Sequence, residues 1–369
     1  MRTHPAAGLR WRAALTWLLL LGSAAAEPLP EGSAAAQALG MEPAREAVRT
    51  HPGWHPPRLI LVDPGLHADL PRLRDAVPQA KLVELPTATK QQLAAADAVL
   101  GSCDHALLAA APHLLWVQWL AAGVERCVHE PLLQERHLLL TNMQRTAAPS
   151  MAEHVMALML ALARHLDYFY RAQQQQQWAA DSPRLEDLAG KTVLVVGLGG
   201  IGTEVARRAH ALGMKVIATR ASSREGPEYV SYVGLPDELP RLVGSADFIV
   251  NCAPLTAQTT GIFNEALFAA MKPGSYFVSV GRGRSTVTAD LIAALRTQRL
   301  AGAALDVVDP EPLPPDNALW RLPNVIITPH VSADTSVTAE QRVLLLHENL
   351  RRYAAGEPML AVVDLGRGY

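Results

Sequence analysis

The feature of this sequence that most restricts its fold is an apolar stretch, VLVVGLGGIG at residues 193–202, that ends in closely spaced glycines. The glycines have the spacing G-x-G-x-x-G, and the helix-like stretch TEVARRAHALG follows them. In such a turn the first glycine permits a tight bend, the second lets the backbone approach a pyrophosphate, and the third lets the helix pack on the strand. The N–H groups at the helix start attract an anion. The stretch therefore predicts a dinucleotide site. Its expected cofactor-binding residues are Gly197, Leu198, Gly199, Gly200, Ile201 and Gly202.

Short apolar runs alternate with helix-like stretches on both sides of this turn. The predicted strands are residues 58–63, 81–85, 98–102, 114–120 and 137–142, and then 191–197, 215–220, 248–254, 276–281, 302–308 and 324–330. Strands separated by helices imply right-handed crossovers and parallel sheets. A chain of 369 residues has room for two or three domains. The pattern predicts an α/β fold with two Rossmann-like, doubly wound parallel-sheet domains and the active site in the cleft between them.

Composition and pattern give the expected boundaries. Residues 27–56 are rich in Ala, Pro and Gly without a strong period, which is typical of a linker. One domain is expected from 57–149 together with 331–369, where a helix-like run precedes the strand-like AVVDL. The other is expected from 150–330 and contains the glycine turn.

A long helix is predicted from Ser150 to about Trp178. Ser150 and Glu153 have the S-x-x-E spacing of a capping box. The run VMALMLALARHL is apolar nearly all round, so both sides of the helix are expected to be buried. QQQQQ at 173–177 ends the pattern, either as a solvated helix end or as a contact surface.

The N-terminal segment 1–26 has the pattern of a targeting sequence. Arg2, Arg10 and Arg12 precede a short apolar run, and small residues follow it. A basic head, a short apolar stretch and an A-x-A end are typical of a secretory signal peptide. This predicts export to the periplasm. The alternatives are an uncleaved anchor, or a start at Met41 that leaves the protein in the cytoplasm.

Composition excludes several kinds of protein. Hydrophobic residues make up 49% and charged residues 18% of the chain, which is too apolar for a disordered protein. The net charge of −2 gives no field that favours nucleic acid, and no membrane binding is expected of a mature chain. Cys103, Cys127 and Cys252 are too few and too scattered for a disulfide framework or a zinc site. Each is therefore expected as a small hydrophobic residue in the core, and no metal is expected.

Arg220 stands where sheets of this kind usually carry an acid, roughly 20 residues after the first glycine of the turn. A carboxylate there bonds the 2′-hydroxyl of NAD and repels a 2′-phosphate, and a guanidinium does the opposite. Ser222, Ser223 and Arg224 add hydroxyls and a second positive charge. The pattern predicts NADP(H), bound by Arg220 and Ser222. The alternative is an NAD(H) enzyme in which Arg220 stacks on the adenine.

Three longer motifs resemble those of one enzyme family. They are VGLGGIGTEVARRAHALGMKVIATR, NCAPLTAQTTGIFNEALFAAMKPGSYFVSVGRG and GAALDVVDPEPLPPDNALWRLPNVIITPH. Over about 58–360 the chain resembles the D-isomer-specific 2-hydroxyacid dehydrogenases, and Arg220 is similar to the arginine of NADPH-preferring glyoxylate and hydroxypyruvate reductases. The resemblance implies a substrate (catalytic) domain from 57–149 plus 331–369, a dinucleotide-binding domain from 150–330, and a homodimer.

The resemblance also implies which side chains act on a 2-oxo acid. The reaction needs a cation to hold the carboxylate and polarise the carbonyl, an acid for the nascent alkoxide, and a group that tunes this acid. The resemblance places these roles on Arg282 in VGRGR, His330 in NVIITPH and Glu311 in DVVDPEPLP. Asp309 is the competing carboxylate, but the family's spacing selects Glu311.

Further residues are assigned by the same resemblance. Pro254 belongs to the expected cofactor site, and Asp306 is expected either near the nicotinamide amide or as a cap of local backbone. The N–H groups of Gly123 and Val124 are expected to receive the substrate carboxylate. Three bulky residues either shape the pocket or belong to the core, namely Trp119, Leu120 and Met143.

The sequence thus predicts NAD(P)H-dependent reduction of a small 2-oxo acid to the D-2-hydroxy acid, with His330 as the acid–base group. Two alternatives stay open, which are NAD-dependent oxidation of such a hydroxy acid and a non-catalytic, dinucleotide-sensing interaction protein. Two positions depart from the family pattern. Ser279 stands where Asn is common, and RSTVTAD from Arg284 replaces a V-D step.

Overall fold

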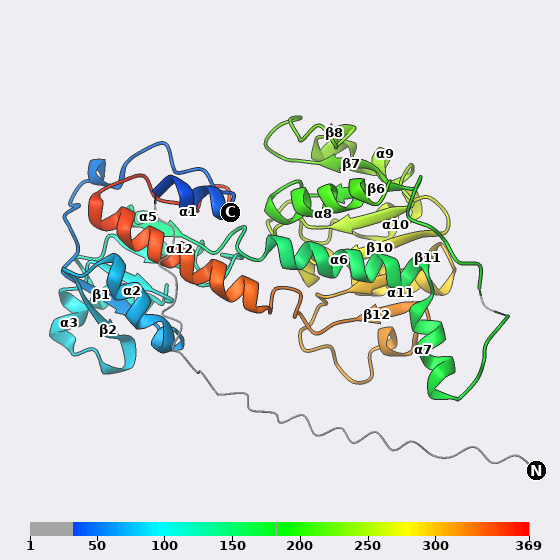
Figure 1. Cartoon of the computed structure of the whole chain (residues 1–369), viewed down its shortest axis with the longest axis horizontal. Helices are drawn as coiled ribbons and strands as arrows, with labels where there is room; N and C mark the ends of the chain where they lie inside the picture. The colour runs from blue at the N-terminus through cyan, green and yellow to red at the C-terminus, as the bar shows by residue number, and fades with distance from the viewer. Residues whose placement is uncertain (1–31, 182, 369) are drawn as a thin grey trace, which may run out of the picture.

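The structure, a computed structural model, describes residues 32–181 and 183–368. Two α/β lobes lie side by side, each built on one parallel sheet (Figure 1). The chain passes from the first lobe to the second at the start of α6 (Ala148–Ala163) and returns before α12 (Ser336–Ala355). The predicted α/β class with two Rossmann-like parallel-sheet domains is confirmed.

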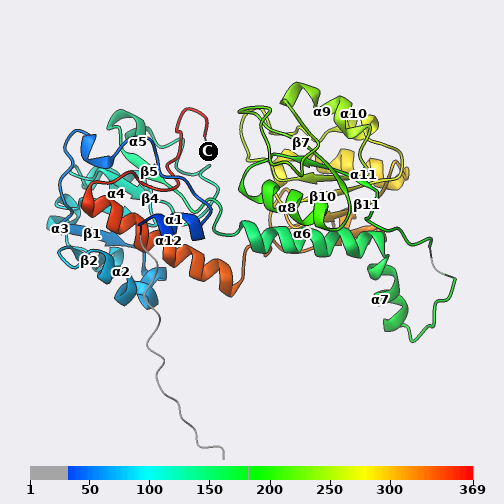
Figure 2. The same cartoon turned by 45° about the horizontal axis from the view of Figure 1, so that its top comes forward.

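The first lobe holds a five-stranded sheet in the order β2-β1-β3-β4-β5. Its strands are β1 (Leu59–Val62), β2 (Lys81–Glu84), β3 (Ala98–Leu100), β4 (Trp116–Gln118) and β5 (Leu139–Thr141). Its shorter helices are α2 (Leu70–Ala76), α3 (Lys90–Ala94), α4 (His105–Ala110) and α5 (Pro131–Glu135). The strands are short, mostly buried apolar runs, as expected of a sheet covered on both faces. α12 packs beside α2 on this lobe, and its Leu345 and Tyr353 share a core with Trp116 (Figure 2).

Residues 32–56, the described part of the predicted linker 27–56, contribute to that core. α1 (Gly32–Ala38) packs against α12, and Ala35 and Leu39 are buried there. The N–H of Gly32 donates to Oε2 of Glu348 at 3.0 Å. The linker prediction is wrong for these residues, because small side chains let the segment fit closely on α12, a contact that no local pattern reveals.

The second lobe holds a seven-stranded sheet in the order β12-β11-β10-β9-β6-β7-β8. Its strands are β6 (Thr192–Val196), β7 (Lys215–Thr219), β8 (Tyr232–Gly234), β9 (Phe248–Asn251), β10 (Ser275–Ser279), β11 (Leu300–Leu305) and β12 (Val325–Ile327). Its helices, besides α6, are α7 (Leu166–Gln174), α8 (Gly200–Ala211), α9 (Leu239–Val243), α10 (Glu265–Ala270) and α11 (Thr288–Arg296). The short β8 was not predicted. Strand order reverses beside β6, which is where ligands bind in such sheets.

The predicted helix from Ser150 to Trp178 is divided in two. α6 starts at Ala148, so Ser150 lies in its first turn and cannot be the N-cap. The Oγ of Ser150 instead lies 2.9 Å from Oγ1 of Thr335, the N-cap of α12. His165 has φ of +48°, a conformation outside the α-helix, and it separates α6 from α7. The capping box is therefore wrong, and the contact of Ser150 with Thr335 joins the two segments that cross between the lobes.

Two of the three cysteines are bonded to each other. Cys103 and Cys127 form a disulfide, with 5.6 Å between their Cα atoms. Both are buried as predicted, but the prediction that they are separate core residues is wrong. They lie beyond the carboxyl ends of the adjacent strands β3 and β4, and strand pairing brings them together. Cys252 is a free thiol, and burial raises its pKa to about 12.

Two predicted segments lie near the ends of the chain, the strand-like AVVDL and the segment 1–26. The strand-like AVVDL forms no regular strand but an antiparallel bridge, between Val362 and Thr141, and the N–H of Val363 donates to the carbonyl of Leu140. The signal-peptide-like segment 1–26 lies outside the described residues. Within the described ranges, no helix combines the length and apolar character needed to cross a membrane.

Candidate active site

Arg282, Asp306 and His330 follow three neighbouring strands of the second sheet. They come after β10, β11 and β12, which pair in parallel. The carboxyl ends of these strands therefore share one edge, and ligands gather at such an edge. Strand order brings the three residues together across long stretches of sequence.

The glycine turn has the shape that a dinucleotide requires. Gly197 has φ of +95°, and a Cβ at Gly202 would lie 2.1 Å from the carbonyl oxygen of Gly197. At Gly199, a Cβ would meet nothing within 4 Å. The N–H of Thr203 donates to the carbonyl of Gly199 at 2.9 Å, so the N–H groups between them remain available to an anion. The turn fits a pyrophosphate over Gly199.

Arg145, which the sequence reasoning missed, lies against this turn. A Cβ at Gly200 would lie 2.8 Å from Cγ of Arg145, although Arg145 belongs to the segment between β5 and α6. Arg145 is exposed and has φ of +69°, which is unusual for a residue with a side chain. In the described ranges, no hydrogen bond or ion pair engages its guanidinium. A cation thus stands beside the helix start where phosphates are expected.

Arg220 is placed by its own loop. Its Nε donates to Oγ of Ser222 at 3.0 Å, and its Nη1 donates to the carbonyl of Glu225 at 3.3 Å. Arg224 instead pairs with Glu238. A hydrogen bond from Tyr232, assisted by Arg241 and Arg224, lowers the pKa of Glu238 to about 2. Arg224 is therefore held by a carboxylate that it shares with Arg241, whereas the guanidinium of Arg220 bonds only neutral oxygen atoms of its own loop.

Arg282 reaches across to the first lobe. Its Nε donates to Oε1 of Glu125 at 2.9 Å, and its Nη1 donates to the carbonyl of Gly281 at 2.7 Å. A Cβ at Gly123 would lie 1.8 Å from Nη2 of Arg282, so only glycine allows this approach. Among the described residues, no hydrogen bond involves the N–H groups of Gly123 and Val124. Glu125 was not predicted, although it directly follows these two residues.

His330 and Glu311 form a hydrogen-bonded pair. Nδ1 of His330 lies 2.8 Å from Oε2 of Glu311, and the other carboxylate oxygen accepts from the N–H of Val308. His330 has φ of +55°, and its N–H donates to the carbonyl of Asp306 at 2.8 Å. The imidazole side chain is 46% exposed.

Asp306 caps the turn that carries His330. Its Oδ1 accepts from Oγ1 of Thr328 at 2.6 Å and from the N–H of Val331 at 3.0 Å, and its Oδ2 accepts from the N–H of Ser332 at 3.1 Å. Burial would raise the pKa of Asp306, but hydrogen bonds from Ser332, Thr328 and Val331 outweigh it, so the pKa lies below its ordinary value. Of the two expected roles, the geometry shows the local cap.

The remaining predicted residues differ in their exposure. Met143 and Val124 are buried at 2% exposure, so the Met143 side chain belongs to the core. Trp119 is partly buried, and its Nε1 donates to the carbonyl of Gly123 at 2.8 Å within the same loop. Leu120 packs at the edge of the first core. Pro254 accepts a hydrogen bond from Thr259 at its carbonyl, beside the glycine turn.

Ser279, one of the two departures from the family pattern, supports the Arg282 turn. Nδ2 of Asn251 donates to Oγ of Ser279 at 3.1 Å and to Oγ of Ser285 at 2.8 Å. Ser285 in turn donates to the carbonyl of Arg282 at 2.6 Å. Ser279 is therefore part of a buried network of hydrogen bonds that supports the turn of Arg282.

In the part of the chain that the structure describes, no group of three or more His, Cys, Asp or Glu side chains could hold a metal ion.

Comparison with known proteins decides the family. Residues 156–332 match the family described as D-isomer specific 2-hydroxyacid dehydrogenase, NAD binding domain. Glyoxylate/hydroxypyruvate reductase A of Serratia proteamaculans (strain 568) is 33% identical over 72% of this chain and 85% of its own length. The chain belongs to the D-isomer specific 2-hydroxyacid dehydrogenases. This dehydrogenase is therefore an NAD(P)-dependent oxidoreductase that binds a nicotinamide dinucleotide.

Further relatives in sequence and in structure agree with this family. Glyoxylate/hydroxypyruvate reductase A of Yersinia enterocolitica is 30% identical over 77% of this chain and 93% of its own length. The NADPH-dependent glyoxylate/hydroxypyruvate reductase of Sinorhizobium meliloti, solved with NADP and sulfate, is 31% identical with a TM-score of 0.74. It covers 85% of this chain and 100% of its own. A probable 2-hydroxyacid dehydrogenase of Rhizobium etli, solved with NADP, has a TM-score of 0.75 at 27% identity over 85% of this chain and 100% of its own.

Proposed function

We propose that this dehydrogenase uses NADPH to reduce a small 2-oxo acid to the D-2-hydroxy acid. The observation that carries the proposal is the pair His330–Glu311, with 2.8 Å between Nδ1 and Oε2, at the sheet edge that also holds Arg282. An acid, a carboxylate that tunes it and a cation that binds a carboxylate are the groups that this reduction needs.

Each of these residues has one task in the proposed reaction. Glu311 holds Nδ1 of His330, so Nε2 is the nitrogen that gives its proton to the carbonyl oxygen of the substrate. Arg282 is anchored through Nε by Glu125 and through Nη1 by the carbonyl of Gly281, and its Nη2 is the nitrogen left for the substrate carboxylate. The N–H groups of Gly123 and Val124 bind that carboxylate from the other lobe. The nicotinamide, when bound, supplies the hydride.

A preference for NADP(H) over NAD(H) rests on the loop after β7. Arg220 and Ser222 offer a guanidinium and a hydroxyl at the position where an acid would repel a 2′-phosphate. The NADP-bound relatives support the same preference. Arg145, whose side chain contacts Gly200, is proposed as a further cation for the dinucleotide phosphates.

Turnover separates this proposal from its alternatives. Purified protein is mixed with NADPH and glyoxylate, hydroxypyruvate or a branched 2-oxo acid, and the fall in nicotinamide absorbance is followed. His330→Ala is expected to abolish the fall while cofactor binding persists, and His67→Ala, an exposed histidine of the first lobe, is the matched control. Cofactor binding without turnover would instead indicate the non-catalytic, dinucleotide-sensing protein. Faster turnover with NAD and a D-2-hydroxy acid would indicate NAD-dependent oxidation of the hydroxy acid.

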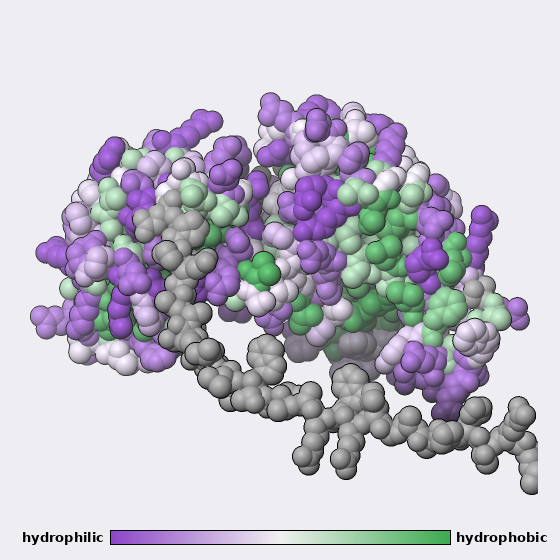
Figure 3. Space-filling model, in the orientation of Figure 1, coloured by the Kyte–Doolittle hydropathy of each residue, from purple (hydrophilic) through white to green (hydrophobic). Residues whose placement is uncertain are grey.

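We also propose that the dehydrogenase is a homodimer. Apolar side chains gather on the surface of the second lobe around α6 and neighbouring elements (Figure 3). The exposed large apolar residues on and after α6 and α7 are Leu160, Leu166, Tyr170, Trp178 and Leu185. An apolar surface of this kind is typical of a protein interface. Light scattering is expected to give twice the chain mass, and Leu166→Glu, at a residue 52% exposed, is expected to lower it.

The domain roles and the location stay proposals as well. Residues 57–149 plus 331–369 would bind substrate and 150–330 the dinucleotide. Export is supported by the disulfide, because disulfides persist in oxidising compartments. A start at Met41 in the cytoplasm is the alternative. N-terminal sequencing of the native protein distinguishes the two.

A further inference from the structure

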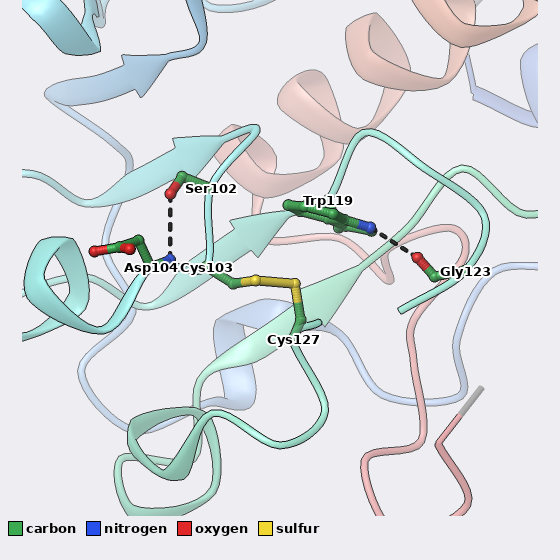
Figure 4. Close-up of a disulfide and its surroundings, with 6 residues drawn as sticks. All are labelled: Ser102, Cys103, Asp104, Trp119, Gly123 and Cys127. Atoms are coloured by element: carbon green, nitrogen blue, oxygen red, sulfur yellow. Dashed lines mark hydrogen bonds between the residues drawn. A yellow bond between two sulfur atoms is a disulfide. The ribbon is translucent and has the colours of Figure 1, made fainter. Parts of the chain in front are cut away.

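The disulfide lies beside the loop that carries Gly123 and Glu125. Cys103 follows β3, and Cys127 belongs to the loop 119–130 between β4 and α5. Figure 4 shows the sulfur bridge close to Trp119, whose indole N–H reaches the carbonyl of Gly123. Cys103, Cys127 and Val124 share one hydrophobic cluster with Trp119. The bridge is therefore part of the support under the substrate loop.

The first half of the loop is held by hydrogen bonds to the chain after β5. Met143 donates its N–H to the carbonyl of Ala121 at 3.1 Å, and Nδ2 of Asn142 donates to the carbonyl of Ala122 at 2.7 Å. These contacts end where the residues that face Arg282 begin.

The second half of the loop, residues 123–129, is not held by hydrogen bonds to the residues described after β5. For residues 123–129, every hydrogen bond within the described chain is either internal to the loop or crosses to Arg282. Cys127 donates its N–H to the carbonyl of Val124 at 2.8 Å, so the bridge fixes the turn that contains Glu125. Within its own lobe, this half is otherwise held only by burial of apolar side chains.

We propose that the Cys103–Cys127 disulfide is a positioning element for substrate binding, which makes the affinity for the 2-oxo acid sensitive to thiol reductants. The kinetic part of this inference rests on the proposed function. A dithiol supplies two electrons and two protons, so that its own thiols become a disulfide while the bridge becomes two cysteine thiols. The freed turn then samples more conformations, and Gly123, Val124 and Glu125 must be ordered again each time substrate binds.

The first test measures kinetics and cofactor binding with and without dithiothreitol. Reduction is expected to raise KM for the 2-oxo acid about fivefold or more, with kcat changed by less than about twofold, because loop ordering is added to the binding step. The dissociation constant for NADPH is expected to stay unchanged, since the glycine turn lies in the other lobe. Cys103→Ala/Cys127→Ala is expected to reproduce the raised KM and to lose the response to reductant.

The controls separate positioning from general stability. Leu73→Ala on α2 is fully buried in the same lobe and is expected to lower Tm without raising KM. An unchanged KM in both the reduced protein and the double variant would overturn the proposal. So would labelling of all three cysteines in the oxidised protein after unfolding, where only Cys252 is expected to react.

A second readout needs no turnover. Amide hydrogen exchange of residues 119–130 is expected to speed up on reduction, while exchange at the glycine turn stays the same. If no 2-oxo acid is reduced at all, the proposed function fails, and this measurement still decides whether the bridge orders the loop. Unchanged exchange in the loop would reject the inference.

Discussion

Nε of Arg282 lies 2.9 Å from Oε1 of Glu125, so the cation proposed for the substrate carboxylate is anchored by a side chain of the opposite lobe. The orientation of the Arg282 side chain therefore depends on how the two lobes lie relative to each other. Closure around substrate would keep the anchors on Nε and Nη1 and leave Nη2 for the ligand.

Glu125→Ala is therefore expected to raise KM for the 2-oxo acid about tenfold, because Arg282 loses its anchor and is no longer held in one orientation. Glu125→Gln keeps an acceptor for Nε and is expected to recover most of the loss. Steady-state kinetics with both variants checks this. Equal losses in the two variants would show that charge, rather than the hydrogen bond, is what Glu125 contributes.

Arg220→Asp is expected to weaken NADPH binding by more than about a hundredfold, because a carboxylate repels the 2′-phosphate, and to weaken NADH binding far less. Fluorescence titration with both cofactors measures the ratio. Arg224→Gln is the control in the same loop, since it removes a guanidinium that is already paired with Glu238 and adds no carboxylate. An equal loss for NADPH and NADH would favour stacking of Arg220 on the adenine.

Arg145→Gly should change stability and cofactor affinity in opposite directions. Glycine relieves the positive φ, so the free energy of unfolding is expected to stay the same or rise by up to about 1 kcal/mol. The loss of the cation is expected to weaken NADPH binding about tenfold and to reduce its dependence on salt. Arg145→Ala removes the cation but keeps the strain, so it should lose affinity without the gain in stability. Unchanged NADPH affinity in both variants would remove Arg145 from the cofactor site.

Asp306→Asn is expected to lower the free energy of unfolding by about 1–3 kcal/mol, because the amide nitrogen cannot accept from the donors that Asp306 now binds. The turn of His330 should shift, and kcat should fall with it. The pKa of Asp306 is lowered in the folded state, so its contribution is complete above the unfolded pKa, about 4, and is lost as pH falls through the lower folded value. Denaturant unfolding of both proteins between neutral and acid pH should show this part of the pH dependence in the wild type alone.

A chain that starts at Met41 lacks α1 and is expected to unfold at a lower temperature than one that starts at Glu31. Leu39 and Ala35 are buried against the first lobe, and Glu348, which accepts from Gly32, is fully buried beside Arg352. Removal of the segment exposes this pair and loses about 2 kcal/mol of burial from Leu39 alone. Calorimetry on the two chains is the measurement. Equal Tm values would show that α1 contributes nothing to the fold.

The local sequence was sufficient to predict those features that depend only on residues close together in the chain. The glycine turn and the parallel strands follow from short patterns, because each pattern fixes its own strand, turn or helix start. The choice of Arg282, Glu311 and His330 rested instead on the resemblance of the surrounding motifs to one family. Parallel pairing then places the ends of β10, β11 and β12 at one edge, and there Nδ1 of His330 lies 2.8 Å from Oε2 of Glu311.

Only the tertiary structure could decide the contacts between distant segments. The bond between Cys103 and Cys127, the position of Arg145 over Gly200 and the anchor of Arg282 on Glu125 each join residues from different elements. The packing of α1 on α12 and the division of the long helix at His165 belong to the same class. The sequence by itself determined which chemical groups are available and on which strands they stand. Which of them touch was decided by the packing of whole elements, since such contacts depend on the summed burial of many side chains rather than on any local pattern.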